Sequence, residues 1–350
     1  MKQAAFKDYL TVLNVVSAIS VVALHANGCF WQFSRNGGYW FSANIMECLF
    51  YFAVPIFIMV SGITLFDYTK RYSTTQFLSR RFYKTVLPFV FWSIIALVAK
   101  IFFTKQISLS EISLVFVVNG IFKASFNTQY WFFPPLFSLY LCIPLFASVE
   151  ENKKVSTLKF LVAVGFVINF LLPFIFNVFK IPIKIPVSVT VTSGFLFYAT
   201  LGWLLDRVEI SAKQRRTIYI LSLVGLMMHI CGTYILSMEA GKIIKTFKGY
   251  HNVPCILYAT GIFIFIKHKV SSCSPRVNNY LLKTCKILQN YTFPIYLLHG
   301  FFIRILVKVL HIDTKTMLWR IGGTFLLILL CVMATWLIRK IPLIGKRVLP

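Results

Sequence analysis

The sequence predicts an all-α membrane protein that crosses the bilayer about ten times. Hydrophobic residues make up 58% of the 350 residues and charged residues only 13%, whereas a soluble domain has about 25% charged residues. Ten stretches approach the roughly 20 apolar residues that a membrane helix needs. The 36 Lys and Arg residues, set against only 10 Asp and Glu residues, gather on alternate loops between these stretches. Lipid is therefore the main solvent of this chain.

Each of the ten stretches is predicted to be a membrane helix because it is a run of mostly apolar residues. The sixth and eighth runs are short, so these helices could be tilted or broken. The half-apolar segment 105–129 is left unassigned, as a surface helix or a re-entrant element. With no internal repeat and no soluble segment, residues 1–350 are predicted to form a single integral membrane domain. The stretches are 9–30, 44–66, 86–104, 130–149, 158–177, 190–206, 217–238, 252–268, 291–310 and 317–338.

Basic residues distinguish the two faces of the membrane. If the N-terminus is inside, the inner segments carry 23 Lys and Arg residues and the outer loops carry 10. The positive-inside rule then places both termini in the cytoplasm. The same distribution argues against a nucleic-acid binder, whose basic residues would gather with aromatic residues on a soluble surface.

Ionisable side chains inside lipid are costly and therefore point to function. Asn14 and His25 lie eleven residues apart in the first stretch, which is about 20° from eclipsed and about 16 Å along a helix. One face of this helix must therefore look into a bundle or a cavity. An imidazole there can act as a general base or acid near neutral pH. The alternative is that His25 only hydrogen-bonds a neighbouring helix.

Other polar residues extend this candidate site. Glu47 falls at a similar depth in the second stretch and could orient the His25 ring, or it could lie in the outer headgroup region. Tyr296 and His299 share a face of the ninth stretch, nearer the inner side. Arg304 follows toward the outside, where it either holds an anionic substrate or snorkels to the interface.

Two features flank the start of the third stretch. In the second stretch, Pro55 frees a backbone carbonyl. Ser61 and Gly62 are small residues that together permit close contact with a neighbouring helix. Arg80, Arg81 and Lys84 lie at the inner face, where such a cluster can bind phosphates. The alternative explanation of the same basic residues is attraction to anionic lipids and the setting of topology. We find no spacing of His, Cys, Asp or Glu that is typical of a metal site.

Five segments, taken in order, resemble one family. They are Asn14-x10-His25, residues 52–62 (FAVPIFIMVSG), Arg81-x-x-Lys84-x-x-x-Pro88, residues 130–144 (YWFFPPLFSLYLCIP) and residues 291–299 (YTFPIYLLH). Together they resemble the acyltransferase 3 family of integral membrane O-acyltransferases over roughly residues 8–338, and most of all its surface-polysaccharide O-acetyltransferases. The chain departs from the family pattern twice, because Asn14 replaces an arginine and Lys84 replaces the second arginine of Arg-x-x-Arg.

The resemblance implies transfer of acetyl from cytoplasmic acetyl-CoA to a hydroxyl of a surface polysaccharide or envelope glycan, in a bacterial plasma membrane. It implies acetyl-CoA as a donor substrate and no permanently bound cofactor. Arg80, Arg81 and Lys84 would then pair with CoA phosphates. His25, oriented by Glu47, would act as general base or carry the acetyl group itself. Substrate contact or structural support is expected from Asn14, Ser61, Trp131, Tyr296, His299 and Arg304.

Two other functions are compatible with a hydrophobic, basic chain. A polytopic transporter or flippase for a lipid-linked glycan would use His25 and Glu47 as a proton relay, although such proteins often contain internal repeats. A membrane scaffold would gain little from costly buried polar residues. Dependence on CoA distinguishes the enzyme from both alternatives.

Overall fold

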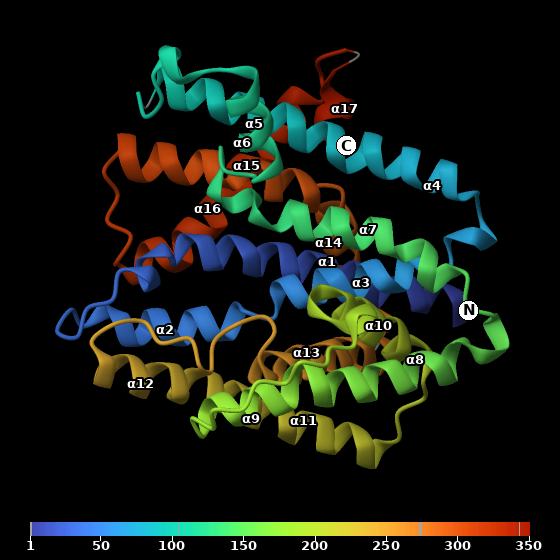
Figure 1. Ribbon diagram of the computed structural model, residues 1–350. Coiled ribbons are helices and arrows are strands. Elements are labelled where there is room, and N and C mark those ends of the chain that lie inside the picture. The colour runs from blue at the N-terminus through green and yellow to red at the C-terminus, as the bar shows by residue number, and fades with distance from the viewer. Residues whose placement is uncertain (1, 104, 273–274, 343) are drawn as a thin grey trace.

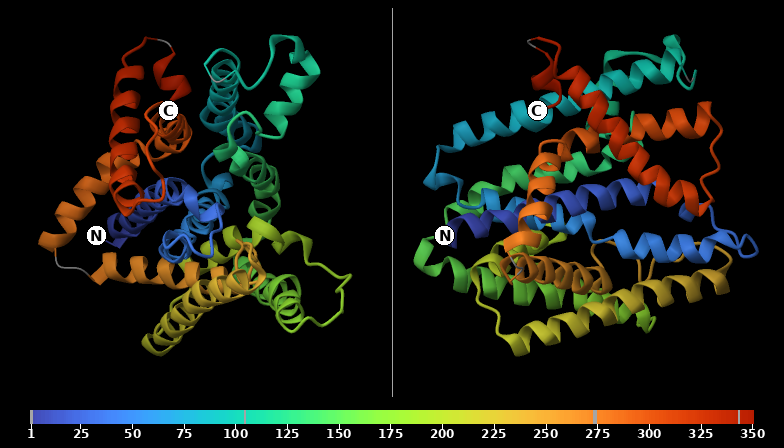
Figure 2. Two further views of the ribbon diagram at one scale, coloured as in Figure 1. Left: turned by 90° about the vertical axis from the view of Figure 1, so that its left-hand side faces the viewer. Right: turned by 180° about the vertical axis from the view of Figure 1, so that it is seen from behind.

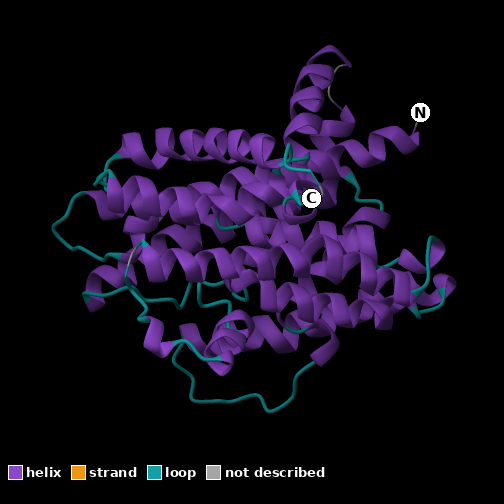
Figure 3. Cartoon of the chain, turned by 90° about the horizontal axis from the view of Figure 1, so that it is seen from above, coloured by secondary structure: helices purple, strands orange, loops and turns teal. Residues whose placement is uncertain are grey.

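The computed structural model describes residues 2–103, 105–272, 275–342 and 344–350, with the backbone alone for residues 2–7 and 275–279. The described chain is helical and contains no strand (Figure 3). Its α-helices are α1 (Lys2–Ala26), α2 (Tyr39–Phe50), α3 (Ala53–Leu65), α4 (Thr74–Arg81), α5 (Leu87–Phe102), α6 (Leu114–Phe122), α7 (Phe133–Ala147), α8 (Glu151–Gly165), α9 (Leu172–Val178), α10 (Gly194–Arg207), α11 (Ala212–Met227), α12 (Thr233–Ala240), α13 (Val253–Ser272), α14 (Pro275–Gln289), α15 (Thr292–Arg304), α16 (Thr324–Ile338) and α17 (Gly345–Val348).

Membrane-length helices dominate the fold, as the sequence predicts. Within the described ranges, nine helices are long and apolar enough to cross a membrane when short turns and π-helical joints are counted with them. The predicted sixth stretch is not among them, because α10 has only 14 residues and begins after an irregular loop at 179–193. The protein is therefore an all-α, multi-pass membrane protein. The nine run Asp8–Ala26, Tyr39–Lys70, Thr74–Phe102, Thr128–Ala147, Glu151–Val178, Ala212–Ala240, Val253–Ser272, Thr292–Val309 and Trp319–Ile338.

Some helices begin or end at other residues than the apolar stretches predict. The first helix ends at Ala26 rather than near residue 30, and its last carbonyl accepts a hydrogen bond of 2.9 Å from Trp319 Nε1. The second stretch divides into α2 and α3 just before Pro55, which lies in the first turn of α3. Proline is tolerated there because the first turn leaves its N–H groups unpaired. The unassigned segment 105–129 contains the short helix α6, a 3-10 turn at Leu109–Glu111 and the start of another at Thr128–Phe132.

Helix α1 lies at the centre of the bundle, as the end-on view in Figure 2 shows. It packs against α3, α13, α14, α15 and α16. The loops 71–73, 148–150 and 208–211 lie at the same end of the molecule as the start of α1, and the loops 32–38 and 310–316 lie at the opposite end (Figure 1). We call these the inner end and the outer end.

An ion-pair network joins three helices at the inner end. The Asp67 carboxylate, just after α3, lies 2.9 Å from Lys154 Nζ of α8 and 3.0 Å from Trp203 Nε1 of α10, and it also pairs with Arg207. Lys154 is only 2% exposed. A buried cation needs such a partner, because desolvation without one is expensive. Some basic residues at this end thus hold helices together.

Helices α3 and α10 approach each other closely in the core. A Cβ added to Gly62 would lie 2.0 Å from the Ala199 carbonyl oxygen, and one added to Gly202 would lie 2.5 Å from Met59 Cα. Both obstructing atoms belong to the backbone, so a side-chain movement cannot relieve the overlap. Small residues at such crossings let helix backbones approach closely.

We expect Gly62→Ala to destabilise the protein by about 2 kcal/mol or more, because overpacking forces the two backbones apart. Thermal unfolding of the purified protein in detergent measures this loss. Gly322→Ala is the control, since its Cβ would meet only Leu318 Cδ1 at 3.7 Å. Equal melting temperatures for the two variants would contradict the tight α3–α10 contact.

Candidate functional site

His25 of α1 and His299 of α15 form a hydrogen-bonded pair inside the bundle. His25 Nδ1 lies 2.8 Å from His299 Nε2, and the ring centres are 4.8 Å apart with an interplanar angle of 20°. His299 is fully buried. The expectation that His299 lies nearer the inner side is wrong. The two residues lie at one depth because α15 is offset along α1, and a sequence does not specify that offset.

The backbone carbonyl of Ile295 determines which ring nitrogens carry hydrogen. It lies 2.8 Å from His299 Nδ1. Because a carbonyl oxygen only accepts, His299 Nδ1 carries the hydrogen, and Nε2 of the neutral ring is an acceptor. His25 Nδ1 must then donate to it, which leaves the lone pair of neutral His25 on Nε2. This nitrogen makes no hydrogen bond within the described part of the chain.

A cavity of about 490 Å³ opens beside His25 and is walled by aromatic rings. The ring of Trp131 stacks on Tyr250 with centres 5.4 Å apart, and Tyr250 stacks on Tyr51 at 4.2 Å. Trp31 completes the aromatic wall. Burial raises the pKa of Tyr250 well above its ordinary value. We call this space the outer cavity.

Glu47 lines the outer cavity, but its partner is Lys248. Glu47 Oε1 lies 2.8 Å from Lys248 Nζ, and the two side chains are 4% and 1% exposed. Lys248 Nζ also lies 3.6 Å from the centre of the Tyr51 ring. We expected Glu47 to orient the His25 ring, but His299 is the residue that hydrogen-bonds it. The physical reason is that a buried carboxylate needs a cation, which a neutral imidazole does not supply.

A second cavity, of about 390 Å³, lies toward the inner end. It brings together several residues that the sequence singled out, namely Asn14, Ser61, Arg81, Lys84 and Tyr296. Lys84 lies in a π-helical segment, Phe82–Val86, that joins α4 to α5. Such segments occur often at functional sites because they redirect side chains. We call this space the inner cavity.

Two of the three basic residues expected to bind the donor line the inner cavity, and the third does not. The Arg81 guanidinium lies 5.7 Å from the Tyr140 ring centre, and its Nε is buried without a hydrogen-bond partner among the described residues. Arg80 instead lies over the ring of Tyr72 at 4.6 Å. It does not line the inner cavity.

A hydrogen bond joins residues that line the two cavities, because the Tyr296 hydroxyl donates to the Gln129 backbone carbonyl. Gln129 lines the outer cavity, whereas Phe132 and Tyr296 line the inner one. Asn14 and His25, on one face of α1, contact the inner and the outer cavity respectively. The predicted polar face of this helix is confirmed.

Arg304 has a role that neither expectation described. Its Nη2 donates to Asn127 Oδ1 at 2.6 Å, and this fully buried Asn127 also caps the turn that contains Gln129 and Trp131. Arg304 therefore holds the segment that supplies part of the outer cavity wall. Neither an anionic substrate nor snorkelling is needed to explain its position.

Several site residues were missed from the sequence. Lys248 and Tyr250 lie in an outer loop, where a basic residue and an aromatic residue carry no sequence signal for the site. Gln129 lies within the segment that was left unassigned. No group of three or more His, Cys, Asp or Glu that could hold a metal ion occurs among the residues that the structure describes.

The fold and the site define a class: a multi-pass membrane protein with a buried histidine pair, an aromatic outer cavity and a cationic inner cavity. The chain belongs to the acyltransferase 3 family, because the family model described as an acyltransferase domain matches residues 7–336. The resemblance seen in the motifs is thereby confirmed, and the protein is a membrane acyltransferase. Comparisons with curated proteins and with solved structures found no match.

We expect Lys248→Met to destabilise the protein by about 3–5 kcal/mol, because it leaves the Glu47 carboxylate buried and unpaired. The double variant Glu47→Gln/Lys248→Met should regain much of this loss. Thermal unfolding in detergent measures both effects. Lys245→Met, a change at an exposed lysine of the same loop, is the control, and a double variant no more stable than Lys248→Met would argue against the pairing.

Proposed function

We propose that this acyltransferase transfers acetyl from acetyl-CoA, bound at the inner cavity, to a hydroxyl of a cell-surface glycan in the outer cavity. The observation that carries the proposal is the position of His25. His25 lines the outer cavity with its Nε2 free of hydrogen bonds to the described residues, and a hydrogen bond between Tyr296 and Gln129 links the linings of the inner and outer cavities. We place the enzyme in a bacterial plasma membrane, with the inner end in the cytoplasm.

The inner cavity has the chemistry that a CoA thioester requires. Arg81 and Lys84 can neutralise phosphate groups, and charge-assisted hydrogen bonds to phosphate are among the strongest that side chains make. Asn14 and Ser61 offer polar contacts deeper in the cavity, where the family arginine is replaced by Asn14. The acyl end of the pantetheine arm must then pass the Tyr296 side chain to reach His25.

The outer cavity suits a sugar. Pyranose rings present apolar C–H faces and polar hydroxyl edges, and binding sites commonly pair aromatic walls with a few placed polar groups. Trp31, Trp131 and Tyr250 supply the aromatic walls. Glu47 supplies a carboxylate whose Oε2 has no hydrogen-bond partner among the described residues, so it can accept from a sugar hydroxyl after a small side-chain shift.

The chemical step follows from the hydrogen-bond chain. The acceptor oxygen attacks the thioester carbonyl carbon while its proton moves to His25 Nε2. The C–S bond breaks, the ester remains on the sugar, and the proton on His25 passes to the leaving thiolate. His299 holds the ring so that Nε2 is the basic nitrogen throughout. The same lone pair could instead attack the thioester, and an acetyl group trapped on His25 without acceptor would identify that route.

Family membership favours this enzyme over a transporter or a scaffold. A transporter would use His25 and Glu47 as one proton relay, but Glu47 is bonded to Lys248 and His25 to His299. A scaffold gives no reason for the free Nε2 of His25.

We expect His25→Ala to lower the rate of acetyl transfer by at least about 100-fold, the usual contribution of a general base. His299→Phe should lower kcat about 10-fold or more without changing the donor KM, because His25 loses its orienting acceptor. His299→Gln should recover part of the rate, since its amide oxygen can accept from Nδ1–H. CoA release and acetyl on the glycan, followed by NMR, measure these rates.

The control for the histidine variants is His268→Ala, at a histidine outside both cavities. It should leave acetyl transfer unchanged. Full activity of correctly folded His25→Ala would refute the proposed base.

We expect Arg81→Gln and Lys84→Gln each to raise the KM for acetyl-CoA about 10-fold, which corresponds to about 1.4 kcal/mol. Acetyl-pantetheine lacks the nucleotide phosphates, so its KM should change little. Arg80→Gln removes the same charge at the same face but outside the cavity, and it is the matched control. If Arg80→Gln and Arg81→Gln have equal effects, the basic residues act through the membrane surface instead.

A further inference from the structure

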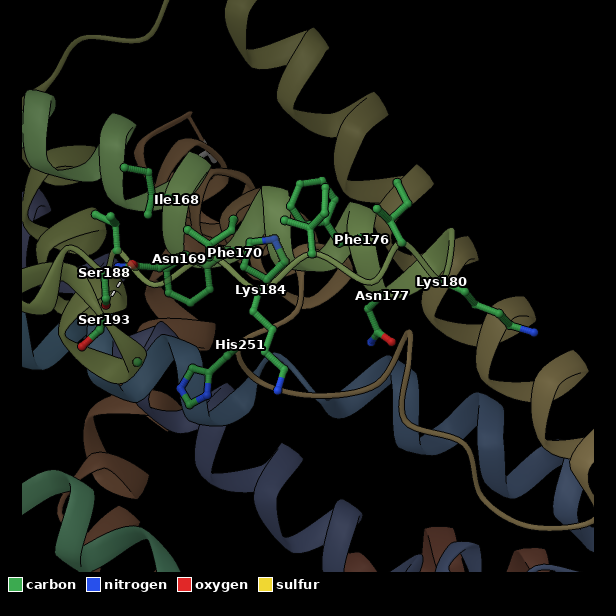
Figure 4. A pocket seen from close by; sticks show the side chains of 16 residues that line it. Ile168, Asn169, Phe170, Phe176, Asn177, Lys180, Lys184, Ser188, Ser193 and His251 are labelled. Carbon is green, nitrogen blue, oxygen red and sulfur yellow. Dashed lines mark hydrogen bonds between the residues drawn. The ribbon is translucent and has the colours of Figure 1, made fainter.

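A third cavity, of about 830 Å³, lies toward the outer end beside the outer cavity. Three chain segments line it: the helical residues 168–177, the loop 180–188 with the start of α10, and His251 (Figure 4). We call it the loop groove. Neither the acyl donor nor the acyl transfer described above uses this groove.

The loop groove is held open by one side chain. Asn169 Nδ2 donates to the carbonyls of Val189 at 2.9 Å and of Thr192 at 3.1 Å. Asn169 Oδ1 accepts from the Val189 N–H at 3.0 Å and from Ser188 Oγ at 3.2 Å. Four hydrogen bonds from one amide fix the loop against the helix, so the groove exists without a ligand.

The chemistry of the loop groove combines apolar walls with positive charge. Ile168, Phe170 and Ile185 contribute apolar surface, and Lys180 and Lys184 are basic. The Lys184 ammonium lies near His251, whereas the Lys180 side chain extends away at the far end of the groove (Figure 4). None of the described residues that line the groove is acidic. Two lysines without a nearby carboxylate create a positive potential that attracts anions.

The loop groove and the outer cavity share a wall. Tyr250 lines the outer cavity, and the next residue, His251, lines the groove. The Phe195 ring packs against both, with ring centres 6.0 Å from Tyr250 and 4.9 Å from His251. The two spaces are therefore neighbours on either side of Tyr250, Phe195 and His251.

We infer that the loop groove binds an anionic sugar unit of the acceptor glycan, adjacent to the unit whose hydroxyl is acylated. This inference rests on the proposed function, because it assigns the acceptor to the outer cavity. The apolar walls pack against the ring faces of the sugar, Lys184 pairs with its carboxylate or phosphate, and Lys180 adds positive potential at the far end of the groove. The acceptor is thus an acidic glycan, and the groove contributes to its selection.

Binding of hexagalacturonate to the purified protein in uncharged detergent, followed by calorimetry, tests this inference without relying on turnover. Its methyl ester has the same sugar chain without the charges. We expect the wild type to bind the acid more tightly than the ester. Lys180→Gln/Lys184→Gln should weaken binding of the acid at least about 10-fold and leave the ester unchanged. Lys242→Gln, at an exposed outer-loop lysine outside the groove, is the control.

Two results would overturn the inference: equal binding of acid and ester by the wild type, or unchanged binding of the acid by the double variant. A second measurement tests whether the groove binds an anionic lipid instead. If the double variant binds the acid normally and loses only its binding of phosphatidylglycerol in mixed-lipid nanodiscs, the groove is a lipid site and the inference fails. Absence of acetyl transfer by the wild type, with selective binding of the acid intact, would overturn the proposed function and the acceptor role of the bound glycan, but not the binding of an anionic sugar by the groove.

Discussion

The hydrogen bond between His25 and His299 is the interaction on which the site depends. In lipid, water cannot satisfy a polar ring, so the protein itself must supply each partner. The Ile295 carbonyl does this for His299, and His299 does it for His25. This series of hydrogen bonds leaves the lone pair of His25 Nε2 without a partner among the described residues, and packing of the ring fixes its direction. A carboxylate in place of His299 would bring a negative charge that itself needs a buried cation.

The same constraint explains the rest of the architecture. Glu47 is compensated by Lys248, and Asp67 by Lys154 and Arg207. Each pair joins segments far apart in sequence, so the cost of placing charge in lipid is offset by contacts that also fix helix positions. The helices can then hold two cavities whose linings are linked by the hydrogen bond between Tyr296 and Gln129.

The sequence located many of the parts correctly. The stripe that contains Asn14 and His25 follows from helical geometry, and both residues face cavities. Arg81 and Lys84, three residues apart before a membrane stretch, do line one cavity, whereas their neighbour Arg80 stacks on Tyr72. Position along a helix is periodic and can be read from sequence. A distortion such as the π-helical segment at Phe82–Val86 depends on packing, so it cannot be read from the sequence.

Composition and charge by themselves determined that this chain is an all-α membrane protein, and the motifs determined its family. Those properties depend on local patterns, namely apolar runs, alternating basic loops and residue spacing. Only the tertiary structure decided that His299 rather than Glu47 orients His25, and that Lys248 pairs with Glu47. The reason is physical: such partners depend on how far one helix slides along another and on where a loop returns, and many distant contacts set both.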